Sequence, residues 1–226
     1  ASDGENYVLN LIDTPGHVDF TVEVERSLRV LDGAIALFCA VGGVEAQSET
    51  VWRQADHYKV PRIAFINKMD RTGANFSRVI DMMSDRLTTH PLPIQLPIGT
   101  GDDFEGIIDL IKMKALYWNT NEQGQTFDFH DIPSTMKDEA ELARETMIEE
   151  ISSQNDELLE KYLENENISE DLIKNAIRSG TLANAFFPIM CGASLRNTGI
   201  QPLIDAIIDF LPSPKEVPAI EGIVPN

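Results

Sequence analysis

Two short segments of the 226-residue chain carry side chains suited to nucleotide chemistry. Residues 13–17 read Asp-Thr-Pro-Gly-His after an apolar run, and residues 67–70 read Asn-Lys-Met-Asp at the end of another. The carboxylate of Asp13 can lie near a magnesium ion, and the amide of Gly16 is free to approach a terminal phosphate. The order and placement of the two segments predict a GTPase, which binds guanine nucleotide and cleaves its terminal phosphate.

The second segment favours guanine over adenine. Asp70 can accept two hydrogen bonds from the N1 and N2 donors of guanine, which adenine does not offer, at roughly 1.5–3 kcal/mol each. We expect Asn67 to tie neighbouring loops together and to reach the base, and the aliphatic stem of Lys68 to cover the ring plane. Met69 completes the guanine-binding loop, and we interpret it as filler.

A phosphate-binding loop of the pattern G-x-x-x-x-G-K-[ST] does not occur in the sequence. The backbone amides and the lysine of such a loop hold most of the phosphate charge. We therefore expect a nucleotide-binding domain that is incomplete at its N-terminus. The 226 residues alone are expected to bind GTP weakly and to hydrolyse it at no measurable rate.

The two segments follow short apolar runs that are separated by amphipathic stretches. Residues 7–12, 34–39, 62–66 and 187–191 are rich in strand formers. Helical spacing occurs over residues 18–30, over 51–58, and on a last apolar face formed by Leu203, Ile204, Ile207, Ile208 and Leu211. Strands that alternate with helices indicate an α/β fold with a parallel sheet and crossover helices.

This alternation is interrupted between residues 93 and 185. Strand candidates cover 94–98, 104–110, 113–118 and 126–129, and three helices follow, with Ser134, Asn155 and Ser169 as N-caps and Gly180 as the last C-cap. We interpret 93–185 as an inserted α+β subdomain in a core made of 1–92 and 186–211. Prolines at 212, 214 and 218 predict a stiff linker over 212–226 toward a second domain.

The chain is strongly acidic. It has 18 Lys plus Arg against 37 Asp plus Glu, a net charge of −19, which opposes binding to a nucleic-acid backbone, so we expect no direct sequence-specific contact with nucleic acid. Residues 131–171 alone hold 14 acidic residues and three basic ones. This run is either a solvated helix surface or a docking surface for a basic or helical protein partner.

Other features of the composition predict a reducing compartment and no membrane attachment. Cys39 and Cys191 both lie in apolar runs and are interpreted as reduced core thiols. No segment has the length and apolar character of a secretory signal or a membrane span.

Nearly the whole chain closely resembles the GTPase domain of the elongation factor G family, the bacterial-type translocation factors of the ribosome. The match is densest over residues 10–76 and continues through the insertion to residues 205–220. Residues 41–50 are more similar to this family than to release or tetracycline-protection factors. The resemblance implies a P-loop GTPase-type fold, GTP or GDP as ligand with Mg²⁺, and a cytoplasmic location. It also implies that the ribosome is the partner, with the inserted acidic subdomain meeting the ribosomal stalk protein.

The resemblance also assigns roles to residues of the site. Asp13 would hold Mg²⁺ through water, His17 would orient the attacking water as the catalytic residue, and Thr14, Pro15 and Gly16 would complete the phosphate turn. In the family a third loop reads Gly-Ser-Ala, whereas residues 192–195 here read Gly-Ala-Ser-Leu. Ala193, Ser194 and Leu195 would then lie beside guanine, where an amide contact survives the exchange but a role for the hydroxyl is doubtful.

Two alternatives and one structural question stay open at this stage. The chain is also compatible with a ribosome-recycling paralogue of the same family, or with a noncatalytic module that binds the ribosomal stalk. In the family another strand lies between those at 7–12 and 34–39. Since unpaired strand edges do not stay buried, we expect residues 9–11 to pair with 35–37, or a strand from another copy to enter.

Overall fold

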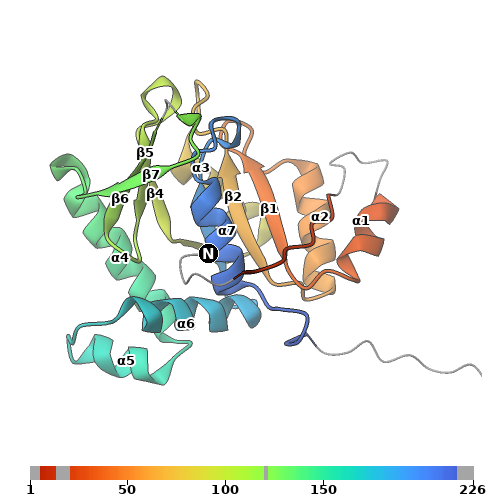
Figure 1. Ribbon diagram of the computed structural model, residues 1–226. Helices are drawn as coiled ribbons and strands as arrows, with labels where there is room; N and C mark the ends of the chain where they lie inside the picture. Colours follow the sequence, from red (N-terminus) through yellow and green to blue (C-terminus); the bar gives the residue numbers. More distant parts are fainter. Residues whose placement is uncertain (1–5, 14–20, 120–121, 218–226) are drawn as a thin grey trace, which may run out of the picture.

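A four-stranded parallel sheet organises the computed structural model, which describes residues 6–13, 21–119 and 122–217. Its strands are β1 (Ala34–Cys39), β2 (Arg62–Asn67), β8 (Phe187–Cys191) and β3 (Pro91–Pro93), in the order β1-β2-β8-β3 (Figure 1). The predicted strands at 34–39, 62–66 and 187–191 are confirmed. The Pro-Leu-Pro strand β3 was not predicted, and its edge position tolerates prolines because no ladder donor is needed there.

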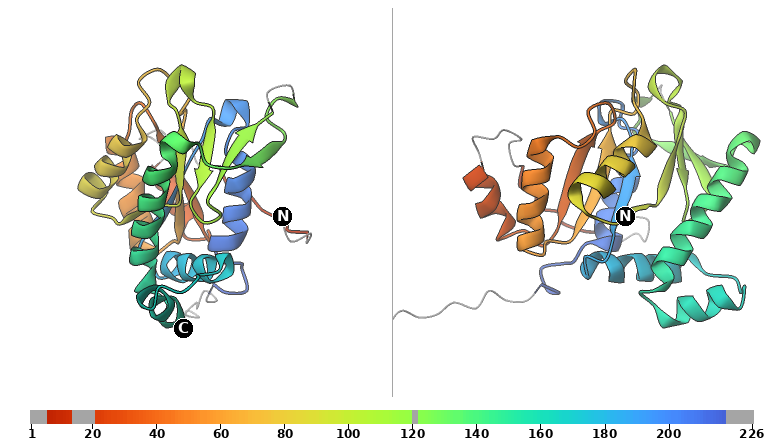
Figure 2. Two further views of the ribbon diagram at one scale, coloured as in Figure 1. Left: turned by 90° about the vertical axis from the view of Figure 1, so that its left-hand side faces the viewer. Right: turned by 180° about the vertical axis from the view of Figure 1, so that it is seen from behind.

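Helices cover both faces of this sheet. Ile63 and Phe65 of β2 pack into a core with α7 (Ile200–Phe210), whereas Ala64 and Ile66 pack on the other face with α2 (Ala46–His57) and α3 (Phe76–Leu87). The alternation follows from the two-residue period of a strand. α1 (Thr21–Leu28) packs against α2 at the outer side (Figures 1 and 2). The parallel sheet with crossover helices is therefore confirmed as an α/β fold.

Residues 7–12 do not form the strand predicted for them. They are exposed, with Val8 and Leu11 86% and 84% accessible, and among the described residues β1 pairs with β2 alone. The expected pairing of residues 9–11 with 35–37 is wrong. The apolar pattern is present, but a strand also requires a neighbour whose backbone accepts and donates the ladder hydrogen bonds.

A second sheet is antiparallel and follows the order of the chain. It contains β4 (Gln95–Ile98), β5 (Gly106–Asp109), β6 (Lys114–Trp118) and β7 (Phe127–His130). The helices α4 (Lys137–Ser152), α5 (Asp156–Leu163) and α6 (Glu170–Leu182) come next, and α7 runs between the two sheets (Figure 1). α1 and α5 lie at opposite ends of the molecule (Figure 2).

The predicted caps of these helices are partly right. Asn155 and Ser169 accept hydrogen bonds from the amides of Leu158 and Leu172 and are N-caps, whereas Ser134 begins the 3₁₀ turn Ser134–Met136 that precedes α4. Gly180 is wrong as a C-cap, because α6 continues to Leu182. A Cβ atom at position 180 would lie 2.1 Å from the ring of Phe186, so close packing explains this glycine.

None of the described helices is both long enough and apolar enough to cross a bilayer. Cys39 and Cys191 are both free thiols, and burial raises the pKa of Cys191.

Candidate guanine-nucleotide site

Two loops meet at the carboxyl edge of the parallel sheet. Cys39 is in register with Asn67 and Ile66 with Cys191, so the chain leaves β2 and β8 at the same level. The amide of Met69 donates to the carbonyl of Gly192 at 3.0 Å, and the amide of Gly192 donates to the carbonyl of Ile66 at 3.0 Å. These bonds bring residues 67–70 and 192–195 side by side, although the chain separates them by more than half its length.

Asn67 links the two loops through its side chain. Its Oδ1 accepts hydrogen bonds from the amides of Lys68 at 2.8 Å and Ser194 at 3.0 Å, and its Nδ2 donates to the Ser194 hydroxyl at 2.9 Å. A carboxamide is suited to this position because it offers both acceptor and donor. The Ser194 hydroxyl, whose role was doubtful from the sequence, therefore accepts a bond that holds the loops together.

Asp70 lies in the loop that follows β2 at this edge of the sheet, and it forms an ion pair. Its Oδ2 is 3.0 Å from Nε of Arg196, and the two side chains are 18% and 57% exposed. The partner was missed in the sequence, since the distance along the chain hides it. Arg196 directly follows the third predicted loop, and a cation at that position could have indicated a partner for Asp70.

The other residues of the two loops differ in exposure. Met69 and Ala193 are buried, which suits filler positions, and Leu195 is 92% exposed at the tip of its loop. Lys68 adopts a left-handed backbone with φ of 65°. A Cβ atom on Gly192 would lie 2.3 Å from the carbonyl oxygen of Thr198, so only glycine permits this approach.

The phosphate segment is described only at its start. Asp13 is exposed, and Thr14, Pro15, Gly16 and His17 lie outside the described residues. A carboxylate oxygen is a ligand type that Mg²⁺ prefers, and the exposure of Asp13 leaves it open to a hydrated ion. The described residues contain no group of three or more His, Cys, Asp and Glu side chains placed to hold a metal.

A large cavity of about 600 Å³ is lined by residues 7–12, 30–35 and parts of α7 and 211–216. Its volume is in the range of small-molecule pockets. However, it borders Ala34 and Ile35 at the amino end of β1, opposite the edge that carries residues 67–70. Because ligands of open α/β sheets bind beyond the carboxyl ends of the strands, this cavity is not the nucleotide site.

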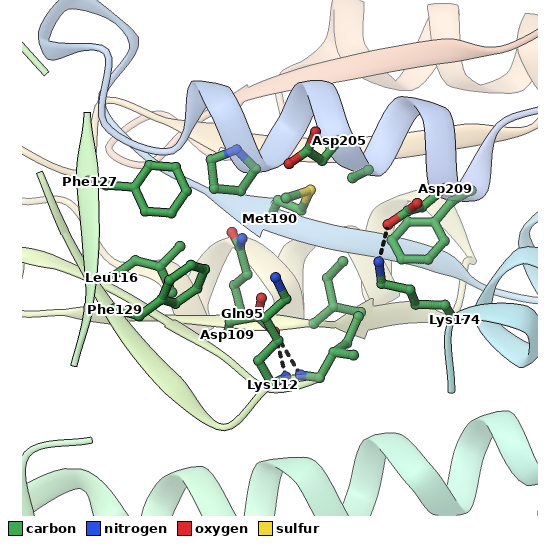
Figure 3. Close-up of a pocket in the computed structure, with 15 residues that line it drawn as sticks. Gln95, Asp109, Lys112, Leu116, Phe127, Phe129, Lys174, Met190, Asp205 and Asp209 are labelled. Atoms are coloured by element: carbon green, nitrogen blue, oxygen red, sulfur yellow. Dashed lines mark hydrogen bonds and ion pairs between the residues drawn. The ribbon is translucent and has the colours of Figure 1, made fainter. Parts of the chain in front are cut away.

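A smaller cavity of about 60 Å³ lies between α7 and the second sheet (Figure 3). Lys174 Nζ lies 2.7 Å from Asp209 Oδ2 there. Burial opposes the charged form of Lys174, but this bond and the nearby acidic groups leave its pKa raised, while burial raises the pKa of Asp109. The volume is well below the roughly 300 Å³ at which ligand pockets begin, so the groups form a polar contact between layers.

The parallel sheet, its crossover helices and the paired loops at its carboxyl edge define an α/β domain of the P-loop GTPase class. Residues 1–213 match the model of the elongation factor Tu GTP binding domain. The chain belongs to this family of translational GTPases, which implies guanine-nucleotide binding and GTP hydrolysis as the family activity.

A solved structure supports the same fold. A crystal structure of a protein from Thermus thermophilus is similar to this chain at 27% sequence identity with a TM-score of 0.80. The match covers 90% of this chain and 30% of the other. The chain thus spans less than a third of the length of that protein.

Proposed function

We propose that the chain is the guanine-nucleotide domain of a translocation factor of the elongation factor G type, acting on the ribosome in the cytoplasm. The observation that supports guanine specificity is the link from Asn67 to Ser194, which joins the two loops beside Asp70 and its partner Arg196. The whole-chain resemblance described above supports the elongation factor G type within the family.

In this proposal the two loops bind the base. The Asp70 carboxylate accepts from N1 and N2 of guanine, Lys68 covers one face of the ring, and exposed Leu195 lies over the base. Asn67 fixes the loops, and backbone amides near Ala193 and Ser194 meet the guanine carbonyl.

The phosphate end of the site is proposed for residues 13–17. Asp13 holds hydrated Mg²⁺, and the amide of Gly16 meets the terminal phosphate. His17 orients water without itself storing a proton. Magnesium, when bound, neutralises charge on the β- and γ-phosphates.

The exposed acidic residues of α4 and α5 are proposed to dock the ribosomal stalk protein. Glu145 and Glu149 are exposed on α4 and, within the part of the chain that the structure describes, form no ion pair of the kind that engages Glu141 and Glu157. Reversing both charges (Glu145→Lys with Glu149→Lys) should weaken stalk-peptide binding and reduce its salt dependence, measured by fluorescence anisotropy. Unchanged binding would leave these helices as a solvated surface.

Base specificity is tested by exchanging the atom that reads the base. Asn at position 70 donates a hydrogen bond where Asp accepts, and xanthine carries a carbonyl where guanine carries its 2-amino group. We expect Asp70→Asn to lose GDP affinity by about two orders of magnitude, from roughly 1.5–3 kcal/mol per charge-assisted bond, and to gain affinity for xanthosine diphosphate.

Calorimetric titration with GDP, xanthosine diphosphate and ATP checks this expectation. Asp85→Asn is the matched control, because Asp85 is an exposed carboxylate on α3. GDP binding that is equal in the parent and in Asp70→Asn would refute the assignment of Asp70.

A further inference from the structure

The loop that follows β8 is supported from outside by the connection between β6 and β7, here called the hairpin loop (residues 119 and 122–126 as described). Asn197 Nδ2 donates to the carbonyl of Gln123 at 2.9 Å. Gly124 has φ of 72°, and a Cβ atom on it would lie 2.1 Å from the carbonyl oxygen of Arg196. The backbones therefore approach as closely as glycine allows.

Gln201 fastens the same hairpin loop to the first turn of α7. Its Nε2 donates to the carbonyls of Gly124 at 2.8 Å and Gln125 at 3.1 Å, and its Oε1 accepts from Trp118 Nε1 at 2.9 Å. Trp118 is buried and packs against Phe127 with ring centroids 5.3 Å apart. The anchor is thus a well-packed part of the second sheet.

These contacts lead to the carboxylate of Asp70, the group proposed to read the base. The hairpin loop fixes the backbone of Arg196 and Asn197, and Arg196 reaches across to Oδ2 of Asp70. A guanidinium nitrogen bound to one lone pair of Oδ2 restricts rotation of the carboxylate, while Oδ1 and the second lone pair of Oδ2 stay available to the two donors of guanine. Guanine needs a defined orientation of this group, because its N1 and N2 donors lie side by side.

We propose that Arg196 and Gln201 are positioning residues for guanine recognition, through which the hairpin loop of the second sheet orients Asp70. This inference rests on the proposed function. It adds that base selectivity depends on side chains that do not touch the nucleotide.

The test compares GDP with inosine diphosphate, which lacks the 2-amino group, in competition titrations on the 226-residue chain. Arg196→Gln and Gln201→Ala are each expected to reduce the preference for GDP over inosine diphosphate by about two- to fivefold, the effect of a partly exposed ion pair. Arg71 is an exposed cation that follows Asp70 in the chain, and Arg71→Gln should leave the preference for GDP over inosine diphosphate unchanged. A merely structural role would weaken both ligands equally and would overturn the proposal, as would tighter binding of both by Arg196→Gln.

A second measurement needs no nucleotide. In a double-mutant cycle of Asp70→Asn and Arg196→Gln, we expect a coupling of about two- to fivefold in the unfolding equilibrium constant. Additive effects would overturn the positioning contact. Because the 226 residues are expected to bind nucleotide weakly, binding of neither diphosphate by the parent chain would leave the cycle alone to decide whether Arg196 positions Asp70.

Discussion

The base-reading edge and the segment that leads to Asp13 differ in how they are supported. At the base-reading edge, Asn67 alone makes three side-chain hydrogen bonds, and the buried residues Met69 and Ala193 lie beneath the two loops. Residues 8–13 are exposed along their length and form no strand among the described residues. Both regions carry motif residues of one proposed site, but only one is positioned by its neighbours.

This difference shows that an apolar sequence pattern does not by itself determine where a strand forms. The β2 strand lies between two parallel neighbours, which satisfy its backbone, and helices bury both of its faces. Residues 7–12 have an equally apolar pattern but lie beside a cavity of about 600 Å³ instead of a strand. An apolar run becomes a strand only where a neighbouring backbone completes its hydrogen bonds.

The largest expected effect compares one residue type in the two regions. Asn67→Ala removes three hydrogen bonds and leaves the amides of Lys68 and Ser194 without their acceptor, which should lower the free energy of unfolding by about 2–4 kcal/mol. Asn10→Ala, in the exposed segment, should change it by less than about 0.5 kcal/mol. Urea denaturation of both variants checks the contrast, and equal effects would break it.

A pair of glycines sharpens the same contrast. The Cβ of Gly192→Ala would meet the Thr198 carbonyl oxygen at 2.3 Å, and this strain should cost about 1–3 kcal/mol. Gly33→Ala, beside the large cavity, would meet only the Leu211 side chain, at 3.0 to 3.2 Å, and should cost less than about 1 kcal/mol. Thermal unfolding measures both variants. A larger loss of stability for Gly33→Ala than for Gly192→Ala would contradict the firmer support assigned to the base-reading edge.

The sequence was sufficient where local pattern and tertiary context agree. The strands β1, β2 and β8 follow from short apolar runs with helices between them, and the N-caps Asn155 and Ser169 follow from residue type. The prediction of a strand at residues 7–12 was wrong, because among the described residues no neighbouring strand pairs with them. The pairing of Arg196 with Asp70 and the bonds of Gln201 were not predicted, because they join parts of the chain that are distant in sequence.

Acid should weaken the contact of Glu216 with Arg178 and Ser213, which lies beside the large cavity. The amide of Ser213 and the guanidinium of Arg178 lower the pKa of Glu216 to about 2, from an ordinary value of 4.5. A depressed carboxyl pKa contributes stability that is complete above pH 4.5 and is lost as the pH falls through 2. Glu216→Gln should therefore flatten this part of the stability profile, measured by urea midpoints between about pH 5 and about pH 2.5. A profile identical to that of the parent would show that the contact is absent in solution.

The smallest expected effect is the strictest test of the comparison. Leu11 is 84% exposed, so Leu11→Ala should change the free energy of unfolding by less than about 0.5 kcal/mol. Amide hydrogen exchange at Leu9 and Leu11 should likewise be fast, because no ladder protects these groups among the described residues. Slow exchange there, with a loss above about 1.5 kcal/mol for Leu11→Ala, would mean that residues 7–12 dock as a strand in solution. The lead-in to Asp13 would then be supported as firmly as the base-reading edge.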